Sequence, residues 1–203
     1  MGNIKRYIIL LLLTIGSAIY VRSVHAQKMN DSVFSALSMS SIPLTDVTEH
    51  KSVFLPFTSA GRLTLFVFLS PECPLCQNYT TVLNKLEKEY RGKVKCYGIF
   101  PGQAYDAASI QAFREKYKIE YPLLIDASFR LTRYLQATVT PETILLNDRN
   151  ELVYKGAIDN WLKDLGKMQP RATAHYLQDA LSRYPDRSNP KRTRPVGCLI
   201  NDR

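Results

Sequence analysis

The sequence predicts a single α/β domain in which a central mixed β-sheet is flanked by helices. Apolar, β-rich runs alternate with segments whose apolar residues recur every three or four positions, which indicates strands alternating with helices. Such alternation is typical of a parallel sheet that is covered on both faces. A turn signal at residues 147–150 separates two further β-rich segments, and it adds a hairpin of antiparallel strands.

Each element follows from a local pattern. A strand is expected at residues 62–69, because RLTLFVFL is apolar without interruption, as in a strand buried on both faces. An amphipathic helix is expected from Pro74 to Gly92, with Pro at the first position, where no N–H is required. The later elements are a strand at 93–100, a helix at 106–118, a strand at 121–125, a short helix at 129–136, hairpin strands at 142–146 and 151–154, and a helix at 172–184. This order resembles the plan of a thioredoxin-like fold with one extra helical stretch.

The N-terminal residues predict export. Residues 1–26 have the order of a secretory signal peptide: two basic residues, an apolar run at 7–21 and Val24-His25-Ala26 as the cleavage site. The apolar run is shorter than the roughly 20 residues that a bilayer-spanning helix needs. We therefore expect cleavage after Ala26 and a periplasmic or secreted protein, rather than one anchored by an uncleaved segment.

The remaining residues are expected to form one domain with a loose segment at each end. Residues 27–44 are polar and are interpreted as a flexible leader, and residues 45–185 as the domain. Residues 186–203 form a basic tail rich in Pro and Arg, which we expect to be loosely held. The chain has a formal net charge of +9, but an exported protein rarely meets nucleic acid. The tail is therefore interpreted as a solvated segment, with no nucleic acid as partner.

The motif that carries chemistry is SPECPLC at residues 70–76, where the first strand gives way to the long helix. The free N–H groups and the dipole of a helix start favour a thiolate at Cys73. In such Cys-X-X-Cys sites the pKa of the first thiol falls from about 8.5 to between about 3.5 and 7. Pro74 begins the helix, and Glu72 opposes its effect because a neighbouring carboxylate disfavours the thiolate. Cys73 is predicted to attack a partner disulfide, and Cys76 to resolve the mixed disulfide.

The cysteines also admit other interpretations. Structural zinc needs four ligands, and His50 and His175 lie in unrelated segments, so neither a metal nor another cofactor is expected. A static disulfide that braces the motif stays an alternative. Cys96 lies within a predicted strand and is interpreted as a buried, inert thiol. The sequence leaves three roles for Cys198: it can fold back to Cys73 as an extra resolving thiol, pair between chains, or take no part in the reaction.

Three segments together resemble the thioredoxin-like superfamily, in its exported redoxin branch of AhpC/TSA-like and TlpA-like proteins. They are LTLFVFL, SPECPLC opening a helix, and VTPETILLNDRNELVYKG. The resemblance covers roughly residues 45–200 and includes Gly197-Cys198, since a subgroup keeps a Gly-Cys near the end. It implies that the Thr140-Pro141 bond is cis, packs beside Cys73 and presents backbone to the substrate chain.

The predicted function is an exported thiol–disulfide oxidoreductase. Its partners would be protein or small-molecule disulfides and an upstream electron donor, for example a membrane-embedded one. A peroxiredoxin-like peroxidase with an antioxidant role is an alternative, with Cys73 peroxidatic and Cys76 or Cys198 resolving. Ser70 fits the peroxiredoxin pattern, but Phe66 stands where that pattern has Pro. A further alternative is a redox-inert binding module that keeps the fold.

Overall fold

A computed structural model describes residues 39–55, 61–184 and 191–201. The described residues belong to one compact unit, Met39–Arg203. The expected signal peptide, residues 1–26, and most of the expected leader lie outside the described residues. None of the helices in the described ranges is long and apolar enough to cross a bilayer.

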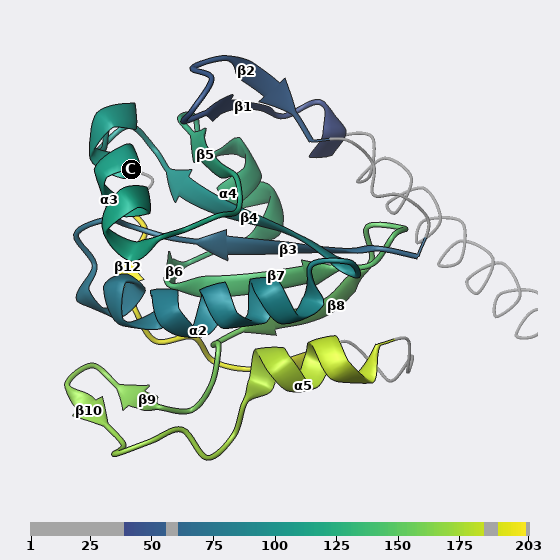
Figure 1. Cartoon of the computed structure of the whole chain (residues 1–203), viewed down its shortest axis with the longest axis vertical. Helices are drawn as coiled ribbons and strands as arrows, with labels where there is room; N and C mark the ends of the chain where they lie inside the picture. Colours follow the sequence, from purple (N-terminus) through teal and green to yellow (C-terminus); the bar gives the residue numbers. More distant parts are fainter. Residues whose placement is uncertain (1–38, 56–60, 185–190, 202–203) are drawn as a thin grey trace, which may run out of the picture. The chain divides into compact units, whose positions relative to one another are not determined.

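The centre of the domain is a mixed sheet of eight strands (Figure 1). Its middle strand is β3 (Leu63–Phe68), which pairs in parallel with β4 (Val94–Pro101). β5 (Leu123–Asp126) continues the sheet in parallel beyond β4. On the other side, β7 (Glu142–Leu146) is antiparallel to β3, and β8 (Leu152–Gly156) is antiparallel to β7. The predicted parallel core with an antiparallel hairpin is therefore confirmed.

Shorter strands complete the sheet and form two small ribbons. β1 (Pro43–Asp46) and β2 (Ser52–Phe54) extend the β5 edge in antiparallel pairing, and β11 (Lys191–Arg192) pairs in parallel with β8. The ribbons are β9 (Leu162–Asp164) with β10 (Lys167–Met168), and β6 (Val139–Thr140) with β12 (Cys198–Leu199).

The helices bury the two faces of the sheet in separate apolar clusters. One cluster holds residues of α2 (Pro74–Tyr90), α3 (Ala107–Tyr117) and α5 (Tyr176–Arg183), and the other holds residues of α4 (Arg130–Leu135) with β1. Leu65 and Val67 of β3 point into the first cluster, whereas Phe66 and Phe68 point into the second. Successive side chains of a strand face opposite sides, so the uninterrupted apolar run follows from burial on both faces.

The register of β3 and β7 positions the functional site. Phe68, the last residue of β3, lies opposite Glu142, the first residue of β7. The chain leaving β3 toward Cys73 and the chain entering β7 through Thr140-Pro141 therefore lie at the same end of the sheet. The motif and the X–Pro bond are separated widely in sequence, and this pairing brings them together.

Both expected loose ends differ from the prediction where the structure describes them. Within the expected leader, Met39, Ile42 and Leu44 are buried, and Leu44 belongs to β1. Within the expected tail, residues 191–192 and 198–199 are strands. Strand pairing holds both segments, and at the N-terminal one the buried side chains of Met39, Ile42 and Leu44 add apolar packing.

Candidate active site

Cys73 is the N-cap residue of α2, and Pro74 follows as the first helical residue, as predicted. The first turn of α2 contains no acidic residue, and the N-cap side chain makes no capping hydrogen bond. A helix N-terminus presents unpaired N–H groups and the positive end of the dipole. The position therefore stabilises negative charge on the Cys73 sulfur.

Cys73 is joined by a disulfide to Cys198, which lies 125 residues further along the chain. The two Cα atoms are 6.3 Å apart, and the exposed fraction of Cys73 is 2%. Figure 1 shows β12, which carries Cys198, beside β6 at the end of the sheet where α2 begins. The predicted pairing of Cys73 with Cys76 stays a prediction, and Cys198 is the partner that the structure brings to Cys73.

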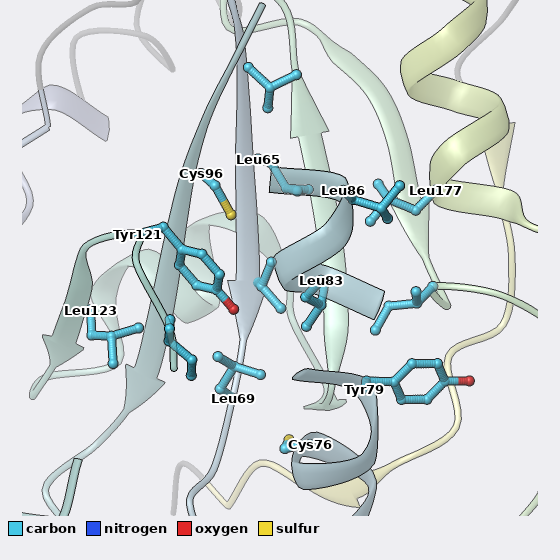
Figure 2. Packing of buried hydrophobic residues seen from close by; sticks show 14 of the residues in the cluster. Leu65, Leu69, Cys76, Tyr79, Leu83, Leu86, Cys96, Tyr121, Leu123 and Leu177 are labelled. Atoms are coloured by element: carbon cyan, nitrogen blue, oxygen red, sulfur yellow. The ribbon is translucent and has the colours of Figure 1, made fainter. Parts of the chain in front are cut away.

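Cys76 is a free, fully buried thiol in the first turn of α2, three residues after Cys73. Its sulfur accepts a hydrogen bond from the Ser70 N–H at 3.4 Å. Burial raises the pKa of the Cys76 thiol to about 12, although hydrogen bonds from Ser70 and the Thr140 side chain act in the opposite direction. Figure 2 shows Cys76 at one end of the apolar cluster that also contains Leu69 and Tyr79. Cys76 thus keeps its proton at neutral pH.

The Thr140-Pro141 bond is cis, as the resemblance implied. The Thr140 carbonyl oxygen lies 3.3 Å from the Cys73 sulfur. Because its side chain also bonds Cys76, Thr140 contacts both cysteines of the motif. The predicted site residues from the two distant segments are therefore adjacent.

Glu142 fixes the loop that carries the cis bond. Its buried carboxylate accepts hydrogen bonds from the Thr138 N–H at 2.8 Å and the Thr138 hydroxyl at 3.2 Å. Lys155 lies 3.8 Å away on the neighbouring strand and donates to the Leu135 and Gln136 carbonyls. Burial lowers the pKa of Lys155, while Glu142 acts in the opposite direction. No pattern in the sequence indicates this pair.

Tyr105, from the loop after β4, also belongs to the site, and the sequence does not predict it. The Ser70 hydroxyl donates to the Tyr105 oxygen at 3.0 Å, and the Tyr105 hydroxyl donates to the Glu72 carboxylate at 3.3 Å. The side chain of Glu72, which directly precedes Cys73 in the motif, is therefore held by a partner from another segment. A cavity of about 230 Å³ adjoins this cluster, and its walls include Ser70, Tyr105, Thr140 and Cys198.

A second cavity, of about 630 Å³, lies along α2, and neither Cys73 nor Cys76 lines it. Its wall contains Tyr79, whose hydroxyl donates to the buried Asp159 carboxylate at 2.6 Å, and Trp161, which packs edge-on against Tyr79. Cys96 is buried away from the site, as predicted, and burial raises the pKa of its thiol. Over the described ranges, no group of three or more His, Cys, Asp or Glu residues is arranged to hold a metal ion.

The fold and the arrangement of the cysteines define a redoxin of the thioredoxin-like superfamily. More narrowly, the chain belongs to the AhpC/TSA family, whose pattern residues 40–155 match. No curated protein sequence matches the chain.

Solved structures agree on the fold. A hypothetical protein from Sinorhizobium meliloti 1021 is 23% identical with a TM-score of 0.63, covering 78% of this chain and 88% of that one. An uncharacterized conserved protein from Geobacillus kaustophilus is 20% identical with a TM-score of 0.63, covering 78% and 87%. A thioredoxin-like protein from Aeropyrum pernix is 16% identical with a TM-score of 0.52, covering 66% and 90%.

Proposed function

We propose that the protein is an exported thiol–disulfide oxidoreductase in which Cys73 is the nucleophile and Cys76 the resolving thiol. The observation that carries this proposal is the bond between Cys73 and a cysteine on an extended, strand-paired segment. A mixed disulfide between such an enzyme and a polypeptide substrate would likewise join Cys73 to a cysteine of another segment. The export part rests on the sequence of residues 1–26, and N-terminal sequencing of the mature protein tests it.

The position of each cysteine supports its role. Cys73 lies at a helix N-terminus, where a thiolate is stabilised, and a thiolate is the form that attacks a disulfide. Cys76 lies one turn further along α2 and is buried, so it stays protonated while Cys73 reacts. Its burial also protects the thiol from outside oxidants.

The proposed cycle conserves electrons and protons at each step. The Cys73 thiolate attacks one sulfur of a partner disulfide, and the other partner sulfur leaves as a thiolate that takes up a proton. Cys76 then loses its proton and attacks the Cys73 sulfur. The bond from Cys73 to the partner breaks, the second partner thiolate is protonated, and the enzyme holds a Cys73–Cys76 disulfide. The reverse sequence delivers a disulfide to a partner dithiol.

The Cys73–Cys198 bond also favours a second candidate, a thiol peroxidase. There the Cys73 thiolate would attack a peroxide oxygen, which yields sulfenic acid and releases the other oxygen as water or alcohol. The Cys198 thiol would then condense with the sulfenic acid to give the disulfide and water. The small cavity beside Ser70 and Cys198 is where a peroxide would reach this pair.

A variant that lacks both resolving thiols separates the candidates. Reduced Cys76→Ser/Cys198→Ser protein is mixed either with a disulfide-bonded protein or with hydrogen peroxide in the presence of dimedone. An oxidoreductase accumulates a mixed disulfide at Cys73, and a peroxidase accumulates a dimedone adduct at Cys73. If neither product forms, both candidates are contradicted and a redox-inert binding module remains. The Cys96→Ala variant is the control, because Cys96 is buried away from the site.

A further inference from the structure

The segment from Lys191 to Ile200, here called the tail, is attached to the domain at two places. At the first, β11 pairs with β8, and the Thr193 N–H donates to the Lys155 carbonyl at 3.0 Å. Gly156 permits this approach, because a β-carbon there would lie 2.3 Å from the Thr193 carbonyl oxygen. The Thr193 hydroxyl also accepts the Ala157 N–H at 3.0 Å. The tail is therefore directed back across the sheet toward the active site.

At the second place the tail adds a strand beside the cis bond. β12 pairs antiparallel with β6, so that Cys198 lies opposite Thr140 and Leu199 opposite Val139. The Ile200 N–H continues the pairing by donating to the Thr138 carbonyl at 3.0 Å. Leu199 is 85% exposed, whereas Cys198 and Ile200 on either side of it pack against the two apolar clusters. The main-chain bonds, the disulfide and these two side chains together hold this strand. Strand addition of this kind is a recurrent mode of binding extended polypeptides.

Gly197 fits closely against the same edge. A β-carbon at Gly197 would lie 2.3 Å from the Thr140 carbonyl oxygen and 2.7 Å from the Thr140 carbonyl carbon. Both atoms belong to the backbone, so a side chain cannot be accommodated by a change of rotamer. Any occupant of this edge that presents its cysteine to Cys73 at the same depth therefore needs glycine before that cysteine.

From these contacts we propose that Gly197–Ile200 is a tethered pseudo-substrate. In the oxidised protein it fills the polypeptide-binding edge of β6 and covers Cys73, and reduction of the Cys73–Cys198 bond releases it. The released edge then accepts a partner polypeptide with a Gly-Cys sequence in the same register. This inference rests on the proposed function, which requires Cys73 to exchange disulfides with polypeptides.

The tail can leave by two balanced reactions. An external dithiol breaks the Cys73–Cys198 bond in two exchange steps, and it becomes a disulfide while both cysteines become thiols. Alternatively, deprotonated Cys76 attacks the Cys73 sulfur, Cys198 departs as a thiolate and takes up the proton, and a Cys73–Cys76 disulfide results. The second reaction changes no oxidation state. It is slow at neutral pH because the buried Cys76 holds its proton.

The first test measures how Cys73 divides between its two partners. The oxidised full chain is equilibrated in a thiol buffer, quenched with acid, and mapped by peptide mass spectrometry. In Gly197→Ala, the ratio of Cys73–Cys198 to Cys73–Cys76 should fall at least about tenfold from the wild-type ratio, or about 1.4 kcal/mol. The matched control is Gly92→Ala, because a β-carbon at Gly92 meets nothing within 4 Å. An unchanged ratio in Gly197→Ala would overturn the proposal.

The second test measures release and occupancy directly. Hydrogen exchange at the Ile200 amide should be slow in the oxidised chain and fast after reduction, since its bond to Thr138 belongs to the docked tail. A Gly-Cys peptide activated as a mixed disulfide should label reduced Cys76→Ser/Cys198→Ser protein faster than a Leu-Cys peptide does. Equal exchange in both redox states, or equal labelling by the two peptides, overturns the pseudo-substrate. No labelling by either peptide refutes the proposed function instead.

Discussion

Replacing Cys198 with Ser should lower the free energy of unfolding of the oxidised protein by about 3 kcal/mol. The native bond joins residues 125 apart, and closing a loop of that length removes roughly 16 cal/mol/K from the unfolded chain, or about 5 kcal/mol at 25 °C. In the variant, Cys73 is left to pair with Cys76. The same relation gives about 1.6 kcal/mol for so short a loop. The difference between the two loops is the expected loss.

Guanidinium chloride unfolding of four samples measures this loss. They are wild type and Cys198→Ser, each oxidised and each fully reduced, with the free energy extrapolated linearly to water. The oxidised pair should differ by about 3 kcal/mol, and the reduced pair by less than about 1 kcal/mol, because no loop is closed in either. Coincident midpoints for the oxidised pair would refute the reasoning. An equal difference in both pairs would also refute it, since the loss would then come from native packing.

Three further outcomes are expected. In the oxidised protein, the rate at which iodoacetamide alkylates Cys76, followed by peptide mass spectrometry, should rise about tenfold per pH unit from pH 7 to pH 9. Burial raises the pKa of this thiol to about 12, so the fraction of reactive thiolate increases throughout that range. A plateau in the rate by pH 9 would contradict the buried position. Glu142→Ala should lower the free energy of unfolding by about 3 kcal/mol because it leaves the Lys155 ammonium without its buried partner. The added substitution Lys155→Met should recover part of that loss in urea unfolding, and a fully additive double variant would argue against the pair. Tyr79→Phe should lower the free energy of unfolding by about 1–3 kcal/mol in thermal or urea unfolding, because the buried Asp159 carboxylate loses its 2.6 Å hydrogen bond. An unchanged midpoint would contradict a stabilising role for this bond.

Elements whose side chains are buried in a regular pattern are predictable from the sequence. The strand at 62–69 and the helix beginning at Pro74 appear as β3 and α2, because burial on both faces and on one face leave different periodicities. The junction between these two patterns is enough to locate Cys73 at a helix N-terminus. The position of Thr140-Pro141 beside Cys73 follows only from the resemblance, since local sequence does not determine long-range contacts.

Elements held by backbone pairing are not predictable in this way. β12 contains Cys198 and the exposed Leu199, so no burial pattern marks it as a strand. At the other end, β1 pairs with β5, and its buried residue Leu44 lies in too short a stretch to stand out from the polar residues before it. Disulfide connectivity does not follow from cysteine spacing, so the sequence alone does not decide whether Cys73 pairs with Cys76 or with Cys198.

Side chains that join distant loops to the site escape prediction for a related reason. Tyr105 reaches Ser70 and Glu72 from the loop after β4, and its position depends on the course of that loop. Gly197 carries one usable signal, its place directly before a cysteine. Its contact with the Thr140 carbonyl becomes visible only when the two strands are paired.

The distance in sequence between Cys73 and Cys198 also orders events during synthesis. At about 5–20 residues per second, the 125 residues between them take roughly 6 to 25 s to translate. During that interval the nascent chain carries Cys73 and Cys76 but not Cys198. The Cys73–Cys198 bond can therefore form only after Cys73 and Cys76 have been present together for that interval, so the nucleophile precedes the segment that covers it.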